Sequence, residues 1–124
     1  MVSPGTEHPT HTEDFVAEGE LLTDVGGTLP YKVLSTPGMI HVMEWACTRL
    51  IREHLPDAAP TVGFEVCIKH VAGAREGARC VVRATLREVV DGRKFRCDVE
   101  VRDGERTIGV GTHERRLLRA PAAA

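Results

Sequence analysis

The chain has 124 residues, a length that fits one domain with a modest hydrophobic core. Its 42% hydrophobic and 27% charged residues are ordinary for a soluble globular protein, and its net charge of −2 argues against a nucleic-acid partner. No apolar run approaches the ~20 residues that span a bilayer, and the N-terminus has no signal-peptide pattern, so we expect a cytoplasmic protein without a membrane partner.

Both ends of the chain are predicted to lie outside the folded domain. Residues 1–12 are polar and lack periodicity, and residues 119–124 are mostly alanine, so we expect tails there and a domain over residues 13–118. The mixed alternation from Phe15 to Leu22 predicts a first strand. The glycines and proline of residues 26–30 end that strand and begin a connecting segment.

A long helix is predicted from about Pro37 to about His54. Thr36 is a good N-cap, proline is tolerated at the first helical position, and Pro56 prevents the helix from continuing. The apolar residues of this segment form a wide stripe, as expected for a helix that packs on a sheet.

The second half of the chain alternates with a period of two, which predicts four strands. Asp91-Gly92 and Asp103-Gly104 separate successive runs and predict tight hairpin turns. The predicted fold class is therefore α+β, with an antiparallel sheet of about five strands and one long helix. Five residues alternate in the first of these runs and are expected to share one face: Val62, Phe64, Val66, Ile68 and His70.

The sequence gives no sign of a bound metal or cofactor. It has no Gly-rich phosphate loop or nucleotide fingerprint, and its cysteines contain no C-x-x-C pair. We therefore expect no metal and no cofactor, and we expect each cysteine to be a small buried side chain. The four cysteines are Cys47, Cys67, Cys80 and Cys97.

Glu44 is a carboxylate on an otherwise apolar helix face. Ile40, Cys47 and Ile51 share that face, so the carboxylate is expected to point into the protein. Burying an unpaired charge is costly, which makes Glu44 a candidate acid, base or nucleophile. A buried salt bridge to an arginine would explain it equally well.

Several other residues could act together with Glu44. His70 ends the apolar face of its strand, so an imidazole and a carboxylate could meet there and serve in general base catalysis. Thr36 adds a hydroxyl at the positive end of the helix, and Gly63 permits close approach by a ligand. Each has a structural alternative: a hydrogen-bonded histidine, a helix cap and a β-bulge. Arg115 could be solvated or paired with an acidic neighbour.

The sequence resembles the fluoroacetyl-CoA thioesterase-like family of hotdog-fold thioesterases. The resemblance covers roughly residues 13–118. It rests on Val-Leu-Ser-Thr-Pro at 33–37, Met-Glu-Trp-Ala-Cys at 43–47, Gly-Phe-Glu-Val-Cys-Ile-Lys-His at 63–70, the strands between 77 and 101, and Gly-Val-Gly-Thr-His-Glu-Arg at 109–115.

The resemblance implies a single hotdog domain that forms a homodimer and hydrolyses an acyl-CoA or acyl-carrier thioester. It implies catalytic roles for Thr36, Glu44 and His70, with Gly63 lining the acyl pocket. The pocket arginine falls on Arg115, with Arg116 as a one-residue alternative.

The segment before the catalytic threonine departs from the family pattern. Fluoroacetyl-specific members carry phenylalanines there, whereas residues 26–34 contain Tyr31 as their only aromatic residue. We therefore expect a different short- or medium-chain acyl group. An enoyl-CoA hydratase or dehydratase of the same fold, a non-catalytic acyl-CoA-binding protein and a structural domain remain as alternatives.

Overall fold

The computed structural model describes residues 8–55 and 60–118. Residues 1–7 of the predicted N-terminal tail and all of the predicted C-terminal tail lie outside these residues. The elements, in chain order, are β1 (Thr10–Val16), a short 3₁₀ helix η1 (Gly19–Leu21), β2 (Leu22–Thr23), β3 (Val33–Leu34), α1 (Thr36–His54), β4 (Thr61–His70), β5 (Arg79–Val90), β6 (Lys94–Asp103) and β7 (Arg106–Leu117).

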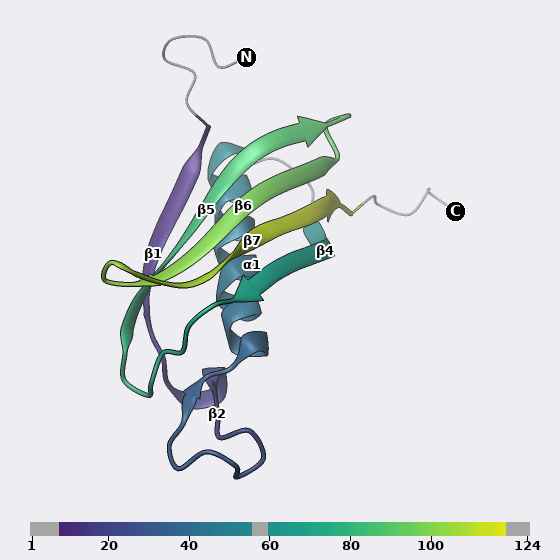
Figure 1. Cartoon of the computed structure of the whole chain (residues 1–124). Coiled ribbons are helices and arrows are strands. Elements are labelled where there is room, and N and C mark those ends of the chain that lie inside the picture. Colours follow the sequence, from purple (N-terminus) through teal and green to yellow (C-terminus); the bar gives the residue numbers. More distant parts are fainter. Residues whose placement is uncertain (1–7, 56–59, 119–124) are drawn as a thin grey trace.

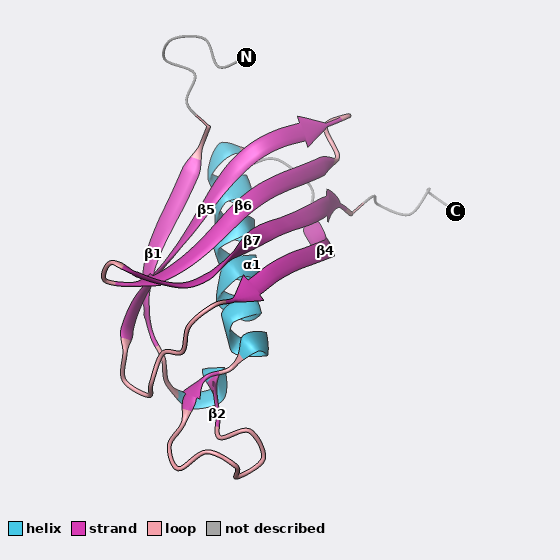
Figure 2. Cartoon of the chain, in the orientation of Figure 1, coloured by secondary structure: helices cyan, strands magenta, loops and turns pink. Residues whose placement is uncertain are grey.

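Five strands form one antiparallel sheet in the order β1-β5-β6-β7-β4, and the sheet curves around α1 (Figures 1 and 2). This confirms the predicted α+β arrangement of one long helix and a five-stranded sheet. Asp91 and Gly92 both have positive φ angles, 56° and 65°, as a tight hairpin turn between β5 and β6 requires. β2 and β3 form a separate two-stranded ribbon that precedes the helix.

The core lies between α1 and the concave face of the sheet. Gly109 of β7 allows the closest approach, because a Cβ atom there would overlap the side chain of Met39. Burial of these apolar side chains provides most of the stability of such a layer. The fully buried side chains include Met39, Met43, Leu50 and Ile51 of the helix and Val82, Phe95, Val101 and Ile108 of the sheet.

The first strand differs from its predicted position. It runs from Thr10 to Val16 instead of from Phe15 to Leu22, so residues 10–12 belong to the sheet and not to a tail. The pattern was missed because polar residues occupy inward positions of β1. His11 pairs with Glu53, and Glu13 pairs with Arg49, both near the end of α1.

The strand β4 is an edge strand with a β-bulge between Gly63 and Glu65. The extra residue reverses the alternation, so the prediction that five residues of β4 share one face is wrong. Ile68 and His70 face the helix side, whereas Phe64 packs on the outside under the guanidinium of Arg116.

One cysteine is exposed because it lies on the outer face of β4, next to Ile68 on the helix side. Cys47, Cys80 and Cys97 are buried as expected, but Cys67 of β4 is exposed.

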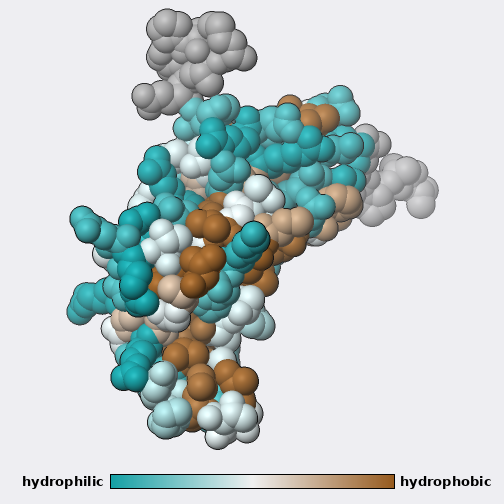
Figure 3. Space-filling model, in the orientation of Figure 1, coloured by the Kyte–Doolittle hydropathy of each residue, from teal (hydrophilic) through white to brown (hydrophobic). Residues whose placement is uncertain are grey.

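Hydrophobic side chains reach the surface in the region of β7 and β4 (Figure 3), where Val62, Phe64, Val66 and Val110 are exposed. No helix in the described residues is both long and apolar enough to cross a membrane.

Candidate functional site

The start of α1 leaves the hydroxyl of Thr36 free for another role. Ser35 is the N-cap, with an extended backbone and a side-chain oxygen that accepts a hydrogen bond from the Gly38 N–H at 2.9 Å. The prediction that Thr36 caps the helix is therefore wrong. Thr36 is instead the first helical residue, and its Oγ1 lies 2.9 Å from Nδ1 of His70.

His70 reaches Thr36 from the last position of β4. Among the described residues its Nε2 is buried and has no hydrogen-bond partner. Burial lowers the pKa of His70 below its ordinary value, so the imidazole is neutral at neutral pH. A neutral imidazole offers one N–H donor and one acceptor nitrogen, which suits proton exchange with a hydroxyl or a leaving group.

Glu44 lies two turns further along α1 and faces the β4–β7 side. Its side chain is 40% exposed, so the carboxylate points into the protein, as expected, only in part. Its Oε2 lies 3.5 Å from Nη1 of Arg115 and 3.9 Å from Nε2 of His113. A half-exposed carboxylate with one long contact to a guanidinium can still reach water or a ligand.

Arg115 is buried and held in place by several acceptors. Its Nε donates to Oγ1 of Thr61 and its Nη2 donates to the Thr61 carbonyl, both at 2.9 Å. Its Nη1 also lies 3.2 Å from Nε2 of His113. Arg116 instead points outward and pairs with Glu114, so it is Arg115 that lies beside Glu44.

Gly63 leaves the space that the Glu44 carboxylate occupies. A Cβ atom at Gly63 would lie 2.9 Å from Oε2 of Glu44, closer than side-chain carbons normally approach. The bulge at this glycine is thus more than an irregularity of the edge strand, because it brings the β4 backbone next to a carboxylate.

The predicted residues form two clusters within one chain. Thr36 and His70 make one, and Glu44, Gly63 and Arg115 make the other. No hydrogen bond or ion pair joins Glu44 to His70 in the described part of the chain. Thr36 and Glu44 are eight residues apart, which is about 12 Å along a helix.

Sequence reasoning did not select His113, although a signal for it exists. His113 and Arg115 are alternate residues of β7, so they share a face of the strand, and both are buried there. Polar residues that repeat with period two on the buried face of a strand indicate an internal polar network.

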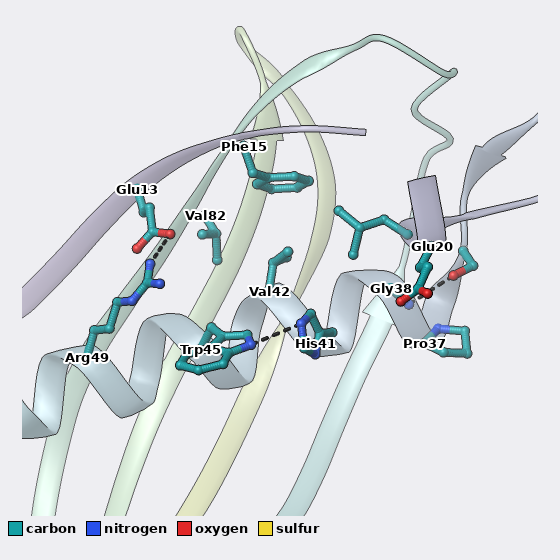
Figure 4. A pocket seen from close by; sticks show the side chains of 12 residues that line it. Glu13, Phe15, Glu20, Pro37, Gly38, His41, Val42, Trp45, Arg49 and Val82 are labelled. Carbon is teal, nitrogen blue, oxygen red and sulfur yellow. Dashed lines mark hydrogen bonds and ion pairs between the residues drawn. The ribbon is translucent and has the colours of Figure 1, made fainter. Parts of the chain in front are cut away.

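A separate cavity of about 610 Å³ lies on the other flank of α1, between the helix and β1 (Figure 4). Phe15, Val42 and Val82 line it, and Trp45 donates to His41 along its rim at 2.9 Å. It contains none of the predicted site residues.

Across residues 8–55 and 60–118, no group of three or more metal-ligating side chains is gathered in one place.

Comparisons with known proteins agree with this fold. The family described as fluoroacetyl-CoA-specific thioesterase matches residues 13–120. The fluoroacetyl-CoA thioesterase of Streptantibioticus cattleyicolor is 37% identical over 87 residues, which are 70% of this chain and 62% of that protein. The match therefore spans less than two thirds of that relative.

Solved structures superpose over most of the chain. A variant of the fluoroacetyl-CoA-specific thioesterase FlK, in complex with fluoroacetate and CoA, has a TM-score of 0.79 at 31% identity and covers 90% of this chain and 93% of its own. A hot-dog-like protein from Thermanaerovibrio acidaminovorans has a TM-score of 0.79 at 17% identity and covers 91% of this chain and 83% of its own. The predicted hotdog fold is confirmed.

Proposed function

The chain belongs to the fluoroacetyl-CoA-specific thioesterase family, and from this premise we propose that it hydrolyses an acyl-CoA thioester to a free acid and CoA. The observation that carries the proposal is the hydrogen bond between Thr36 and His70. Because Ser35 caps the helix, the cap does not account for Thr36, and a hydroxyl paired with a neutral imidazole is typical of a catalytic site.

The substrate is a short- or medium-chain acyl group other than fluoroacetate. The segment of residues 26–34 has Tyr31 as its only aromatic side chain, and Tyr31 is exposed with the guanidinium of Arg75 over its ring at 3.7 Å. A single solvent-facing ring does not enclose a small fluorinated group. The solved relative that holds CoA supports CoA as the carrier.

The protein acts as a homodimer formed through β4. This strand is an edge of the sheet, and an unpaired edge with exposed apolar side chains favours pairing with another strand. Pairing the ten residues of β4 with their antiparallel copy puts residue 61 of one strand opposite residue 70 of the other, and Gly63 opposite Ile68. Adjacent strands lie about 4.8 Å apart.

Such a dimer unites the two clusters. Glu44 and Gly63 of one subunit approach Thr36 and His70 of the other, and Ile68 and His70 both face the helix side. Each dimer then has two equivalent sites, and each site draws residues from both subunits.

The residues divide the reaction between them. The Glu44 carboxylate removes a proton from a water molecule whose oxygen adds to the thioester carbonyl carbon. The Thr36–His70 pair positions the thioester. When the C–S bond breaks, sulfur leaves as a thiolate, and the proton that Glu44 took from the water passes through His70 to the sulfur.

The carbonyl oxygen becomes negatively charged in this reaction and needs donors. The helix start has few, because Pro37 has no N–H and the Gly38 N–H is bonded to Ser35. We assign the role of hydrogen-bond donor to the backbone of the β4 bulge at Gly63. The extra residue of this bulge is left out of the strand pairing between β4 and β7.

A purely structural role for Glu44 fits the geometry less well. Its contact to Arg115 is 3.5 Å long and its side chain is 40% exposed, whereas a structural buried pair is closely bonded and shielded. The carboxylate also lies against a glycine that keeps space open beside it.

Thiol release from acyl-CoA esters of two to ten carbons tests the function. We expect release from at least one short or medium chain, with fluoroacetyl-CoA not preferred over acetyl-CoA. Crotonyl-CoA, assayed for loss of its enoyl absorbance, is the control for the hydratase alternative. Hydration of crotonyl-CoA without thiol release from any ester would overturn the proposal.

A further inference from the structure

His113 is the histidine that lies beside Glu44. Its exposed fraction is 2%, and its Nε2 is 3.9 Å from Oε2 of Glu44. It stands between two parts of the site, the β4 bulge on one side and the Arg115 guanidinium on the other. The reaction outlined above does not use it.

The partners of His113 define its protonation state. Nδ1 lies 2.8 Å from the carbonyl oxygen of Glu65, which can only accept, so Nδ1 carries the proton. Nε2 lies 3.2 Å from Nη1 of Arg115, which can only donate, so Nε2 is unprotonated. Both contacts require the neutral Nδ1–H tautomer, and burial lowers the pKa of His113 in the same direction.

Through these bonds His113 connects the bulge to the carboxylate. Thr61 holds the Nε and Nη2 nitrogens of Arg115, and His113 and Glu44 share Nη1. The Glu65 carbonyl belongs to the residue that closes the bulge after Gly63. A shift of the imidazole would therefore move both Arg115 and the backbone that faces the carboxylate.

We propose that His113 is a positioning residue of the thioesterase site, which orients Arg115 towards Glu44 and anchors the β4 bulge through its neutral Nδ1–H tautomer. This inference rests on the proposed function. His113 touches neither water nor substrate in this scheme and acts through its two neighbours.

Two amide substitutions separate the contact of His113 with the Glu65 carbonyl from its contact with Arg115. The amide of asparagine superposes on Nδ1 of histidine and can still donate to the Glu65 carbonyl, whereas the amide of glutamine superposes on Nε2 and can still accept from Arg115. We expect His113→Asn to lower kcat by about 10- to 100-fold with little change in KM, since a misplacement of about 1 Å can cost that much. His113→Gln should retain more of the wild-type kcat than His113→Asn.

A structural role alone predicts a different result. It would lower the melting temperature of the variants while leaving the kcat of the folded fraction near that of the wild type, and that outcome would overturn the inference. Equal kcat losses in the two variants would also overturn the assignment of the Arg115 link.

Nitrogen NMR of the histidine rings gives a readout that needs no activity. We expect a protonated Nδ1 and an unprotonated Nε2 for His113 in the wild type, and a shifted Nε2 resonance in Arg115→Lys. The opposite tautomer would overturn the inference even if the enzyme is active. If no acyl-CoA is hydrolysed but the tautomer is as expected, the proposed function fails and the network stands.

Discussion

The substitution Gly63→Ala tests the space beside Glu44. The new Cβ would lie 2.9 Å from Oε2 of Glu44, 3.5 Å from Cε1 of His113 and 3.7 Å from Nη1 of Arg115. Only the first of these contacts is too short. The carboxylate is at the end of a flexible, 40% exposed side chain, so it moves away more readily than the backbone does.

The substitution is expected to lower activity without a comparable loss of stability. An ordinary contact is at least 3.4 Å, so Oε2 must retreat by about 0.5 Å, which lengthens its 3.5 Å contact to Arg115. We expect kcat to fall about 10- to 100-fold. The φ of Gly63 is not positive, so alanine restricts the unfolded chain without backbone strain and the free energy of unfolding should stay within about 1 kcal/mol of the wild type.

Thiol release measures kcat, and urea unfolding measures stability. Gly73→Ala is the matched control, since a Cβ at Gly73 meets nothing within 4 Å and its φ is not positive either. A Gly63→Ala protein with wild-type kcat would refute the reasoning, as would a loss of kcat that Gly73→Ala shares.

Three further predictions concern the helix start, pH and the sheet edge. Thr36→Ala should lower kcat without loss of stability, whereas Ser35→Ala should cost about 1 kcal/mol of unfolding free energy, because Ser35 carries the cap; equal stability losses would contradict this. Because the folded protein has a lowered His70 pKa, kcat should hold down to pH 6.5 and fall as the pH drops through that pKa. Stability should fall as the pH drops from 6.5 towards that pKa, since the unfolded state binds the extra proton; replacing His70 with Ala should weaken this pH dependence without removing it, because burial lowers the pKa of His113 as well. In the proposed pairing Val66 lies opposite Glu65 of the partner subunit, so Val66→Glu would set two like charges directly opposite each other and light scattering should give a smaller mass than the wild-type dimer. An unchanged mass would contradict an interface formed through β4.

The fold was largely predictable because its signals are local. The helix was predicted within one residue at its start, and both Asp-Gly turns lie where the dipeptides indicated. The first strand was missed because His11 and Glu13 face inward, where their partners Glu53 and Arg49 come from a distant part of the chain. Hydrophobic periodicity cannot identify an inward-facing polar residue whose charged partner comes from a helix later in the sequence.

The site was less predictable, because a β-bulge decides which side chains of β4 face the helix. The sequence pointed to Glu44 and His70, and the structure puts each in a polar cluster. Alternation alone could not locate the bulge at Gly63, and so it assigned Phe64 to the wrong face. His113 was not predicted because its role depends on its contacts with Glu65 and Arg115. The sequence does not show these contacts.

The most direct test of the account is a mixture of two inactive variants, Glu44→Gln and His70→Ala. If each site combines Glu44 of one subunit with His70 of the other, a mixed dimer has one intact site and one doubly altered site. Random exchange of equal amounts, by unfolding and refolding together, should then recover about one quarter of the wild-type thiol release. Activity that stays at the level of the separate variants after exchange, or full activity in either variant alone, would contradict the shared thioesterase site.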